Sequence, residues 1–538
     1  MTQSHILGIA TQFPELQNTV EGTEAFFKKW AKPSEGLEKT LKINRSTRIL
    51  TRPSVSALTS PLLNGPQAPT IKEVNKVFMQ EGVKLAVQAA EKALADWGGK
   101  REDITHLVCN TCTASAYPGF DHAVLMALGL GLDVDRTLLH GVGCAGGLSA
   151  LRLANSFAQI PSSKPARILV IATEVTSTLV RSELEELDRS TGKMGSVGVC
   201  LFSDGASAMV VGGGEVQEGE KASFEVIKTL TETLPDTVPD LGFNVDENGW
   251  KAIISPRVPS LTSKAVPNMY KKLLVAAAGS SDLTPSLPFL SSEEPTSTPP
   301  SSLDWLIHPG GASILAKIEH SLELRSSDHT RASWEVYVKR GNTSSVSIGA
   351  VIERSRALGG REGCVGVSFG PGVTVEGCLL RRTGWKGRRA ELNGGMKVEV
   401  DKEPVSPPPA VGTKRKRGDA GEDSDDDERE TTMEVGGKKR SIAATNGHAK
   451  DLVTVNGKSN GVSHTSAEAA KIAHVDGATN GNGHVTTNGT DNGEDKNAPG
   501  KHEGGVINGQ VNGIISAPEG FSRDLNVGET QEKMTTVP

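Results

Sequence analysis

The amino-acid sequence predicts a layered α/β fold of two similar halves, followed by a tail that does not fold. Strand-like and helix-like segments alternate with short turns along the first part of the chain, which is typical of layered α/β proteins with buried sheets. All six tryptophans and all three tyrosines lie before residue 386, and Phe521 is the only such large aromatic beyond it. A segment with so little to bury cannot offset the entropy lost on ordering, so we expect disorder over residues 391–538.

The elements of the first half follow from its apolar patterns. Residues 5–14 form an apolar run closed by proline, which predicts a core strand. Residues 77–96 repeat apolar side chains at helical spacing and predict a helix. Residues 104–111 and 166–175 have the composition of buried strands, and residues 138–159 pass from a strand through a glycine-rich turn into an amphipathic helix.

The same order of elements returns later in the chain. Residues 302–322 (SLDWLIHPGGASILAKIEHSL) predict a strand that ends in a turn and continues into a helix, so we expect two halves that are built alike. Residues 280–302 are rich in Pro, Ser and Thr and predict a surface insertion. Beyond residue 393 come a basic KRKR cluster, an acidic block and repeated Asn-Gly pairs, which are typical of a flexible tail. The basic clusters could direct nuclear import, but such clusters are also common in disordered tails.

Composition excludes several classes of protein. The net charge of -6 and the pI near 6.1 give no general attraction to nucleic acid or to an anionic membrane. The six cysteines are spread thinly, as reduced intracellular thiols are, and Cys109 and Cys112 have no second C-x-x-C pair with which to hold a metal. The N-terminus lacks the pattern of a signal peptide, and no uncharged apolar run reaches about 18 residues. We therefore expect a cytoplasmic protein with no membrane span.

Cys144 is the first candidate catalytic residue. It lies where a strand and a glycine-rich turn lead into a helix. Backbone amides and the helix dipole at such a point favour a negative charge and lower the pKa of a thiol. The surrounding glycines let a substrate approach the backbone closely. Cys144 is therefore a candidate nucleophile, although a small buried cysteine facing the sheet would give the same local pattern.

His308 and Asn342 are candidate partners of this thiol. His308 follows an apolar strand and precedes Pro-Gly-Gly, so its imidazole is expected at a strand end, where pockets form. Asn342 lies in a small polar cluster that introduces an apolar helix, where it could also serve only as the N-cap. An imidazole can hold a cysteine nucleophile as an ion pair, and an imidazole and an amide can both donate hydrogen bonds to a developing oxyanion. The occurrence of the three together, in the order Cys, His, Asn, favours a nucleophilic thiol with two donors for an oxyanion.

The chain resembles the chalcone synthase superfamily, the type III polyketide synthases, over roughly residues 5–382. The Phe-Gly-Pro-Gly motif at residues 369–372 and the following VTVE are the most specific to this family. The tail and the proline-rich insertion are similar in character to those of fungal members. The segments that carry the resemblance are ILGIATQFP, ITHLVCNTCTASAYPGFD, GVGCAGGLSALRLA, ATEVTS, LFSDGASAMVVG, DWLIHPGGASIL, GNTSSVSIGAVIE and VSFGPGVTVEGCLL.

The resemblance implies an iterative condensation. Cys144 would take the acyl group from a coenzyme A thioester, and His308 with Asn342 would stabilise the enolate formed when malonyl-CoA loses carbon dioxide. The enolate would attack the acyl-cysteine and lengthen it by two carbons, and repetition would give a chain that closes to a ring. Malonyl-CoA and acyl-CoA are then substrates, and no metal, flavin or nicotinamide cofactor is needed.

The resemblance also implies cavity and coenzyme A residues. Phe202 matches the family's gatekeeping phenylalanine, and Tyr117 falls where a side chain crosses the dimer interface. The positions that match cavity-lining residues are Cys112, Thr113, Thr176 and Ser344. Arg45 best matches a coenzyme A contact. The neighbouring cations that could pair with the phosphates are Lys39, Lys42, Arg48 and Arg52.

Two positions depart from the plant members of the family. Ser368 stands where they have glycine, and no second gatekeeping phenylalanine aligns near Trp250 and Ala252. The second departure predicts a differently shaped cavity and a different starter. By analogy with fungal relatives we expect a medium or long fatty acyl starter and an alkylpyrone, alkylresorcinol or resorcylic acid product.

The family resemblance implies a thiolase-like fold of five layers, α-β-α-β-α, and a homodimer. Residues 1–225 would form the first half with the nucleophile, and residues 226–390 the second half with His308 and Asn342. Two other hypotheses about function are also compatible with the sequence. One is a ketoacyl carrier-protein synthase III, which condenses only once. The other is a catalytically idle scaffold whose tail binds nuclear partners.

Overall fold

The computed structural model describes residues 3–189, 197–247, 249–279, 287–291 and 294–384. All of these belong to the first of two compact units, Met1–Gly418 and Asp419–Pro538. The predicted disordered tail at residues 391–538 lies outside the described residues, and so does part of the predicted insertion at residues 280–302. None of the helices in the described part of the chain combines the length and the hydrophobicity needed to cross a membrane.

A mixed sheet runs through the described part of the chain in the order β11-β12-β13-β8-β1-β7-β6-β4-β5. Its strands are β1 (Ser4–Gln12), β4 (His106–Asn110), β5 (Asp135–Leu139), β6 (Arg167–Glu174), β7 (Gly205–Gly213), β8 (Phe224–Thr233), β11 (Asp304–Ile307), β12 (Gly363–Gly370) and β13 (Thr374–Arg382). The first half of the sheet runs β1-β7-β6-β4, and the second half repeats this order as β8-β13-β12-β11. In both halves the first two pairings are antiparallel and the third is parallel. The repeat confirms the expectation of two halves built alike.

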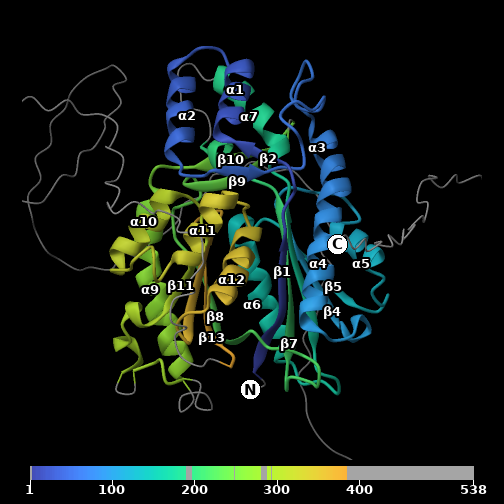
Figure 1. The fold of residues 1–538 in the computed structure, drawn as a ribbon, viewed down its shortest axis with the longest axis vertical. Coiled ribbons are helices and arrows are strands. Elements are labelled where there is room, and N and C mark those ends of the chain that lie inside the picture. Colours follow the sequence, from blue (N-terminus) through green and yellow to red (C-terminus); the bar gives the residue numbers. More distant parts are fainter. Residues whose placement is uncertain (1–2, 190–196, 248, 280–286, 292–293, 385–538) are drawn as a thin grey trace, which may run out of the picture. The chain divides into compact units, whose positions relative to one another are not determined.

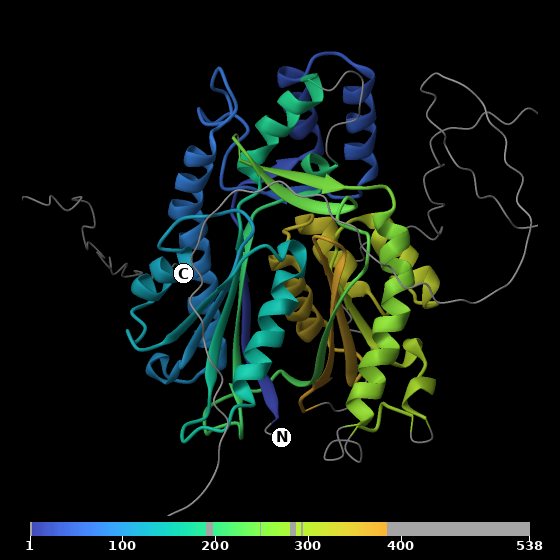
Figure 2. The same cartoon turned by 180° about the vertical axis from the view of Figure 1, so that it is seen from behind.

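Helices separate and cover the two halves of the sheet (Figures 1 and 2). Helices α4 and α5 pack on the first half, and α9, with α10 against it, packs on the second. Helices α6 and α12 lie between the halves, and each contacts strands of both. Their bounds are α4 (Val83–Trp97), α5 (Phe120–Leu128), α6 (Gly146–Ala158), α9 (Val258–Ala278), α10 (Ala312–Ser321) and α12 (Val346–Leu358). This arrangement gives the five layers α-β-α-β-α that the sequence predicted.

The two central helices approach each other closely at Gly147. A side chain on Gly147 would meet both the Ile348 side chain and the Ser345 carbonyl oxygen at 2.4 Å. Both helices are largely apolar and buried, so their contact joins the cores of the two halves. The first residues of α6 and of α12 are therefore held next to each other, which decides where the site can form.

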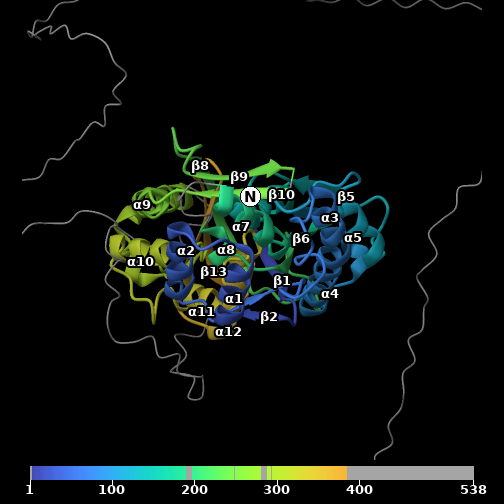
Figure 3. The same cartoon turned by 90° about the horizontal axis from the view of Figure 1, so that it is seen from above.

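A smaller group of elements covers one end of the sheet and lies at the top of Figure 1. These elements are β2 (Gln17–Thr19), α1 (Val20–Trp30), α2 (Glu35–Ser46), β3 (Thr51–Pro53), α3 (Ile71–Val77), α7 (Val180–Arg189), α8 (Gly198–Leu201), β9 (Leu241–Asp246) and β10 (Gly249–Ile254). Helix α11 (Arg331–Arg340) lies below them in this view and packs against α12. Figure 3 shows this end from above. Short 3-10 turns occupy Arg101–Asp103, Gly143–Ala145, Ser177–Leu179, Pro295–Ser297 and Pro300–Ser302. The β9-β10 hairpin forms its own small sheet.

One predicted helix begins earlier than expected. The helix expected at residues 77–96 is preceded by α3 and by a π-helical turn, Phe78–Gly82, that leads into α4. Thr70 and Glu73 form a capping box, in which the Thr70 hydroxyl accepts from the Glu73 amide and the Glu73 carboxylate accepts from the Thr70 amide. The segment after the cap, IKEVNK, has only two apolar residues, Ile71 and Val74. The amphipathic pattern alone therefore located only the second part of the helical segment.

Candidate active site

Cys144 lies in the turn that leads into α6. Gly143 has a φ of 49°, and a side chain there would meet the Pro371 ring at 2.7 Å. The Phe-Gly-Pro-Gly loop therefore packs directly on the turn that carries Cys144. The cysteine is half-buried and borders a cavity. Its thiol donates a hydrogen bond to the Ser344 hydroxyl, with 3.4 Å between Sγ and Oγ.

Asn342 lies in the segment before α12. Its amide nitrogen donates to the Leu201 carbonyl oxygen at 2.9 Å, and its own carbonyl oxygen accepts from the Ser203 amide at 3.0 Å. This short parallel bridge ties Asn342 to Phe202. The Asn342 side chain is not the cap of α12, because Oδ1 accepts from the Ser344 amide at 2.8 Å and Ser345 is the N-cap residue. The side-chain Nδ2 donates to the Gly310 carbonyl oxygen at 3.3 Å.

His308 directly follows β11, as the sequence predicted. Its backbone amide donates to the Val367 carbonyl oxygen at 2.8 Å, which holds the residue at the strand end. The imidazole is buried, and Nδ1 has no hydrogen-bond partner among the described residues. Because Asn342 Nδ2 bonds the carbonyl oxygen of Gly310, the loop that begins with His308 lies against Asn342. Asn342 Oδ1 accepts from the amide of Ser344, whose hydroxyl accepts from the Cys144 thiol, so Asn342 and Ser344 together link the two loops.

The side chains of the site are more buried from solvent than the sequence indicated. Burial raises the pKa of the Cys144 thiol to about 11, although hydrogen bonding with Ser344 and the nearby Asn342 side chain act to lower it. Burial lowers the pKa of His308 to about 3. The expectation that the start of α6 would push Cys144 toward a thiolate is therefore outweighed by desolvation. In the free protein at neutral pH, the site holds a neutral thiol and a neutral imidazole.

Glu174 is a buried carboxylate next to this site that the sequence analysis did not single out. It ends β6 and accepts from the Thr113 hydroxyl at 2.9 Å, the Cys112 amide at 3.1 Å and the Ser345 hydroxyl at 2.5 Å. Burial raises the pKa of Glu174, and these hydrogen bonds oppose the shift. A charged residue at the end of the otherwise apolar strand RILVIATE is the signal that could have revealed it.

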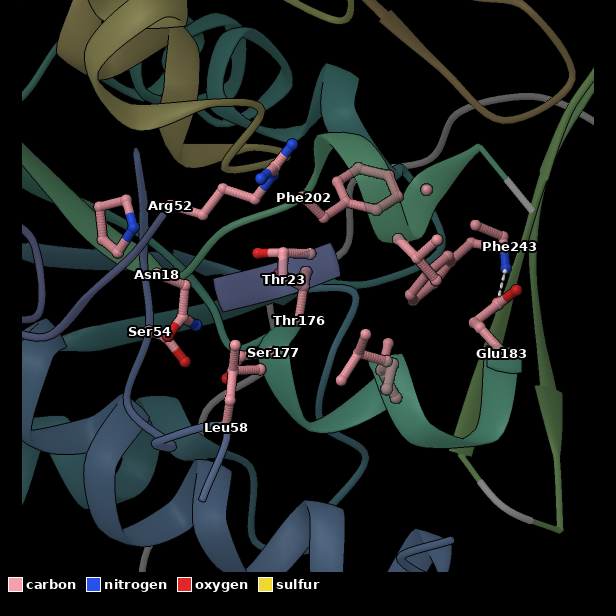
Figure 4. Close-up of a pocket in the computed structure, with 16 residues that line it drawn as sticks. Asn18, Thr23, Arg52, Ser54, Leu58, Thr176, Ser177, Glu183, Phe202 and Phe243 are labelled. Carbon is pink, nitrogen blue, oxygen red and sulfur yellow. Dashed lines mark hydrogen bonds between the residues drawn. The ribbon is translucent and has the colours of Figure 1, made fainter. Parts of the chain in front are cut away.

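One cavity adjoins Cys144, and a second cavity adjoins the first. The first, here called the Cys144 cavity, encloses about 390 Å³ including its open mouth, and Cys112, Cys144, Phe202 and Ser344 are among the residues that line it. The second, here called the side cavity, encloses about 590 Å³ including its mouth (Figure 4). The residues that line both are Thr176, Phe202, Phe243 and Ala252.

The predicted cavity residues thus fall in different places. Cys112, Thr176, Phe202 and Ser344 line a cavity. Thr113 is fully buried and directs its hydroxyl to Glu174, and it is not among the lining residues of either cavity.

Tyr117 is 95% exposed and precedes a cis peptide bond to Pro118. The structure of one chain places it on the surface and outside both cavities.

Four of the five predicted coenzyme A residues lie on or next to α2. Lys42, Arg45 and Arg48 are exposed, and Lys39 is partly exposed and pairs with Glu35. Arg45 forms an ion pair with Glu24 at 2.6 Å, and the Arg48 guanidinium lies 5.7 Å from the centre of the Trp334 ring.

Arg52 differs from these four. Its side chain is buried, and its Nη2 donates to Asn44 Oδ1 at 2.8 Å while its Nε donates to the Cys200 carbonyl oxygen at 3.0 Å. These bonds connect α2 to α8. Arg52 also lines the side cavity, and its Nη1 has no hydrogen-bond partner among the described residues.

Comparison with known proteins identifies the family. Residues 8–215 match the N-terminal domain of chalcone and stilbene synthases, and residues 293–383 match the C-terminal domain of the same family. The acylalkylpyrone synthase csyB of Aspergillus oryzae is 37% identical over 391 residues, which cover 70% of this chain and 94% of that protein. The type III polyketide synthase pspB of Penicillium soppii is 37% identical over 384 residues, which cover 70% of this chain and 96% of that protein.

Solved structures give the same result for the fold. A type III pentaketide synthase from Neurospora crassa matches with a TM-score of 0.65 and 40% identity, over 70% of this chain and 99% of that one. CsyB complexed with CoA-SH matches with a TM-score of 0.65 and 33% identity, over 70% of this chain and 100% of that one. These neighbours confirm the thiolase-like fold.

The chain belongs to the chalcone and stilbene synthase family, and within it to the type III polyketide synthases. It is accordingly an acyltransferase that joins coenzyme A thioesters by Claisen condensation.

Proposed function

We propose that this enzyme repeatedly condenses malonyl-CoA onto a medium or long fatty acyl-CoA starter and releases an alkylpyrone, alkylresorcinol or resorcylic acid. We propose Cys144, His308 and Asn342 as its catalytic residues. The single observation that carries the assignment is a chain of hydrogen bonds between the two loops. The Cys144 thiol donates to the Ser344 hydroxyl, the Ser344 amide donates to Asn342 Oδ1, and Asn342 Nδ2 donates to the Gly310 carbonyl oxygen in the loop that begins with His308. In this proposal the division into residues 1–225 and 226–390 has a chemical meaning, because the first half supplies the nucleophile and the second supplies the donors.

The first step is acylation of Cys144. The thiol sulfur attacks the starter thioester, the bond to coenzyme A sulfur breaks, and His308 carries the thiol proton to the departing coenzyme A. In the free site the imidazole is a weak base, because burial lowers its pKa, so His308 would relay the thiol proton to coenzyme A as the thioester bond breaks and would not hold it beforehand. A resting thiolate–imidazolium pair is not required.

The second step is decarboxylation and condensation. Malonyl-CoA loses carbon dioxide, and the electron pair of the broken bond becomes an enolate. N–H groups of His308 and Asn342 stabilise its oxygen, and a dry site makes such hydrogen bonds stronger than they would be in water. The enolate carbon then attacks the acyl group on Cys144, whose sulfur leaves. Coenzyme A carries the product, which is two carbons longer.

The proposed partners of the enzyme are its coenzyme A substrates and a second copy of the chain. The exposed cations Lys39, Lys42, Arg45 and Arg48 on and beside α2 would pair with coenzyme A phosphates. The exposed Tyr117 supports a homodimer, in which this side chain would be covered by the second copy.

We also propose that the enzyme acts in the cytoplasm and needs no bound cofactor, because the thioester substrates carry the reacting groups themselves. The predicted nuclear import clusters lie outside the described residues.

The test uses the full-length protein, malonyl-CoA and a series of acyl-CoA starters from short to long, with products identified by mass spectrometry. We expect multiply extended pyrones or resorcinols, and their complete loss in Cys144→Ala. Cys364→Ala is the matched control, because this buried thiol lies on β12 and lines neither cavity. Singly extended β-keto products would instead favour a ketoacyl carrier-protein synthase III. Absence of any Cys144-dependent product would favour the idle scaffold.

A further inference from the structure

Cys112 is a second thiol in the Cys144 cavity, and the proposed condensation gives it no role. In the sequence it forms a C-x-x-C pair with Cys109, but the structure places the two cysteines in different surroundings. Cys109 belongs to the buried apolar cluster around α4 and α5 and lines neither cavity. Cys112 lies beyond the end of β4 and lines the same cavity as Cys144. The cysteine that Cys112 faces is therefore Cys144.

The two thiols of this cavity share one hydrogen-bond partner, the Ser344 hydroxyl. Its Oγ lies 3.4 Å from the Cys144 sulfur and 3.5 Å from the Cys112 sulfur. No more than two hydrogen-bond lengths therefore separate the two sulfur atoms. A disulfide needs about 2 Å between them, so both side chains must rotate toward each other and the Ser344 hydroxyl must turn aside.

Cys112 also has a proton acceptor beside it. Its thiol donates to the Glu174 carboxylate, with 3.4 Å between Sγ and Oε2, and its amide donates to the same oxygen at 3.1 Å. Burial raises the pKa of Glu174, which makes this carboxylate a stronger base than an exposed one. A thiol attacks a second sulfur as it loses its proton, so Glu174 supplies the base that the buried Cys112 needs.

The remaining cysteines do not compete for this role. Among the cysteines of the described residues, Cys144 alone is partly exposed, so a small oxidant reaches it first. Cys200, Cys364 and Cys378 are buried, and they line neither cavity. Cys112 is thus the thiol in position to react with an oxidised Cys144.

We propose that Cys112 is a resolving cysteine, which forms a reversible disulfide with Cys144 when the enzyme without an acyl group meets hydrogen peroxide. The Cys144 sulfur first takes one oxygen atom from the peroxide and becomes a sulfenic acid, and the remainder of the peroxide leaves as water. The Cys112 sulfur then attacks the Cys144 sulfur. The Cys112 proton passes to Glu174 and leaves with the displaced hydroxyl group as a second water. In total, two thiols are oxidised to one disulfide and one peroxide is reduced to two waters.

The disulfide switches condensation off and protects the nucleophile. A sulfenic acid that finds no second thiol is oxidised further to a sulfinic acid, which thiol reductants do not reverse. A disulfide is opened again by thiol exchange. The inference rests on the proposed function in one respect, that Cys144 is the thiol on which condensation depends. A starter bound to Cys144 should block the reaction, because the acylated sulfur has no free thiol.

The test treats the full-length enzyme with hydrogen peroxide at about pH 8.5, where more of the thiol is ionised. Peptide mass spectrometry without reductant should show a Cys112–Cys144 cross-link that has lost two hydrogen atoms, and activity should fall about tenfold or more. Dithiothreitol should restore both the free thiols and the activity. Enzyme loaded with palmitoyl-CoA before the treatment should not form the cross-link.

Two variants show whether Cys112 is the resolving thiol. In Cys112→Ser the hydroxyl keeps a hydrogen-bonding group but cannot form a disulfide. After the same treatment, Cys144 of this variant should gain two or three oxygen atoms, and dithiothreitol should not restore the activity of the untreated variant. Cys109→Ala is the matched control, because Cys109 lies in an apolar cluster and lines neither cavity. It should form the cross-link and recover as the unaltered enzyme does.

Two results would overturn the inference. One is a cross-link between Cys109 and Cys112, which would make the C-x-x-C pair the redox pair. The other is oxidation of Cys144 that dithiothreitol fails to reverse in the unaltered enzyme, to the same extent as in Cys112→Ser. The cross-link is read from peptides and needs no condensation. An enzyme that forms it but gives no Cys144-dependent product with any starter would therefore refute the proposed function and support the disulfide.

Discussion

The two halves of this enzyme have the same strand order but place different residues at equivalent points. In the first half, β4 ends before Thr111 and Cys112, and α6 is preceded by Cys144. In the second half, β11 ends before His308, and α12 is preceded by Asn342. The first half thus presents thiols and hydroxyls around a buried carboxylate, whereas the second presents an imidazole and an amide.

This difference shows how two halves with the same fold can supply different chemical groups to one site. Because α6 and α12 touch at Gly147, the residues just before the two helices come together at the centre of the molecule. The halves need not be chemically equal there, since only their backbones repeat. We infer a division of work in which one half carries the acyl group and the other stabilises negative charge.

The largest expected effect on activity comes from removing Asn342, a hydrogen-bond donor in the second half. Asn342→Ala and Asn342→Asp should both lower the rate of malonyl-CoA decarboxylation by about 10²- to 10³-fold, because each removes an N–H group aimed at the enolate. Acylation of Cys144 should survive in both. Asn342→Asp keeps an oxygen that can accept from the Ser344 amide, so it separates the chemical loss from a structural one. Loss of acylation with decarboxylation intact would contradict the division of work.

The next largest effect is the pH dependence of the reactivity of the Cys144 thiol in the first half. With a Cys144 pKa near 11, the thiolate fraction grows with pH, so alkylation by iodoacetamide should accelerate about tenfold per pH unit between about pH 7 and 9. Peptide mass spectrometry would follow the modification of Cys144 in particular. A rate that already levels off below about pH 8 would indicate a thiolate that is held by protonated His308. That result would contradict the neutral thiol and neutral imidazole of the free enzyme.

The smallest expected effect tests the contact between the halves. Gly147→Ala should reduce the free energy of unfolding by about 1–3 kcal/mol, since the new methyl group has no room between α6 and α12. Gly65→Ala is the control, because a side chain there would have its nearest neighbour at 3.5 Å. Chemical denaturation of both variants measures the difference. Equal stability of the two would mean that the central helices can separate freely.

Much of the fold was predictable because its signals are local. Apolar runs located β1, β4, β6 and β11, and the glycine-rich turn located the start of α6. Cys144, His308 and Asn342 could be proposed because strand ends and helix starts are recognisable in sequence. The beginning of the helical segment at Ile71 was missed, since its first turns are polar and depend on a capping box.

The remaining features depend on contacts between distant residues. The raised pKa of Cys144 comes from burial by surrounding segments, which no local pattern contains. The burial of Arg52 could not be predicted from the basic residues around it in the sequence. It depends on a hydrogen bond to Cys200 in α8, which is far away along the chain. The pairing of Phe243 with Ala252 required the register of the hairpin. From the sequence alone, only the lack of a phenylalanine near Ala252 could be recognised.

The most direct test of the account is to load the full-length enzyme with palmitoyl-CoA in the absence of malonyl-CoA and map the acyl group by peptide mass spectrometry. We predict one palmitoyl thioester on Cys144, retained in Asn342→Asp and absent in Cys144→Ala. Palmitoylation of a different cysteine, or no acyl-enzyme with any starter, would contradict the central claim that the first half of the fold carries the growing chain.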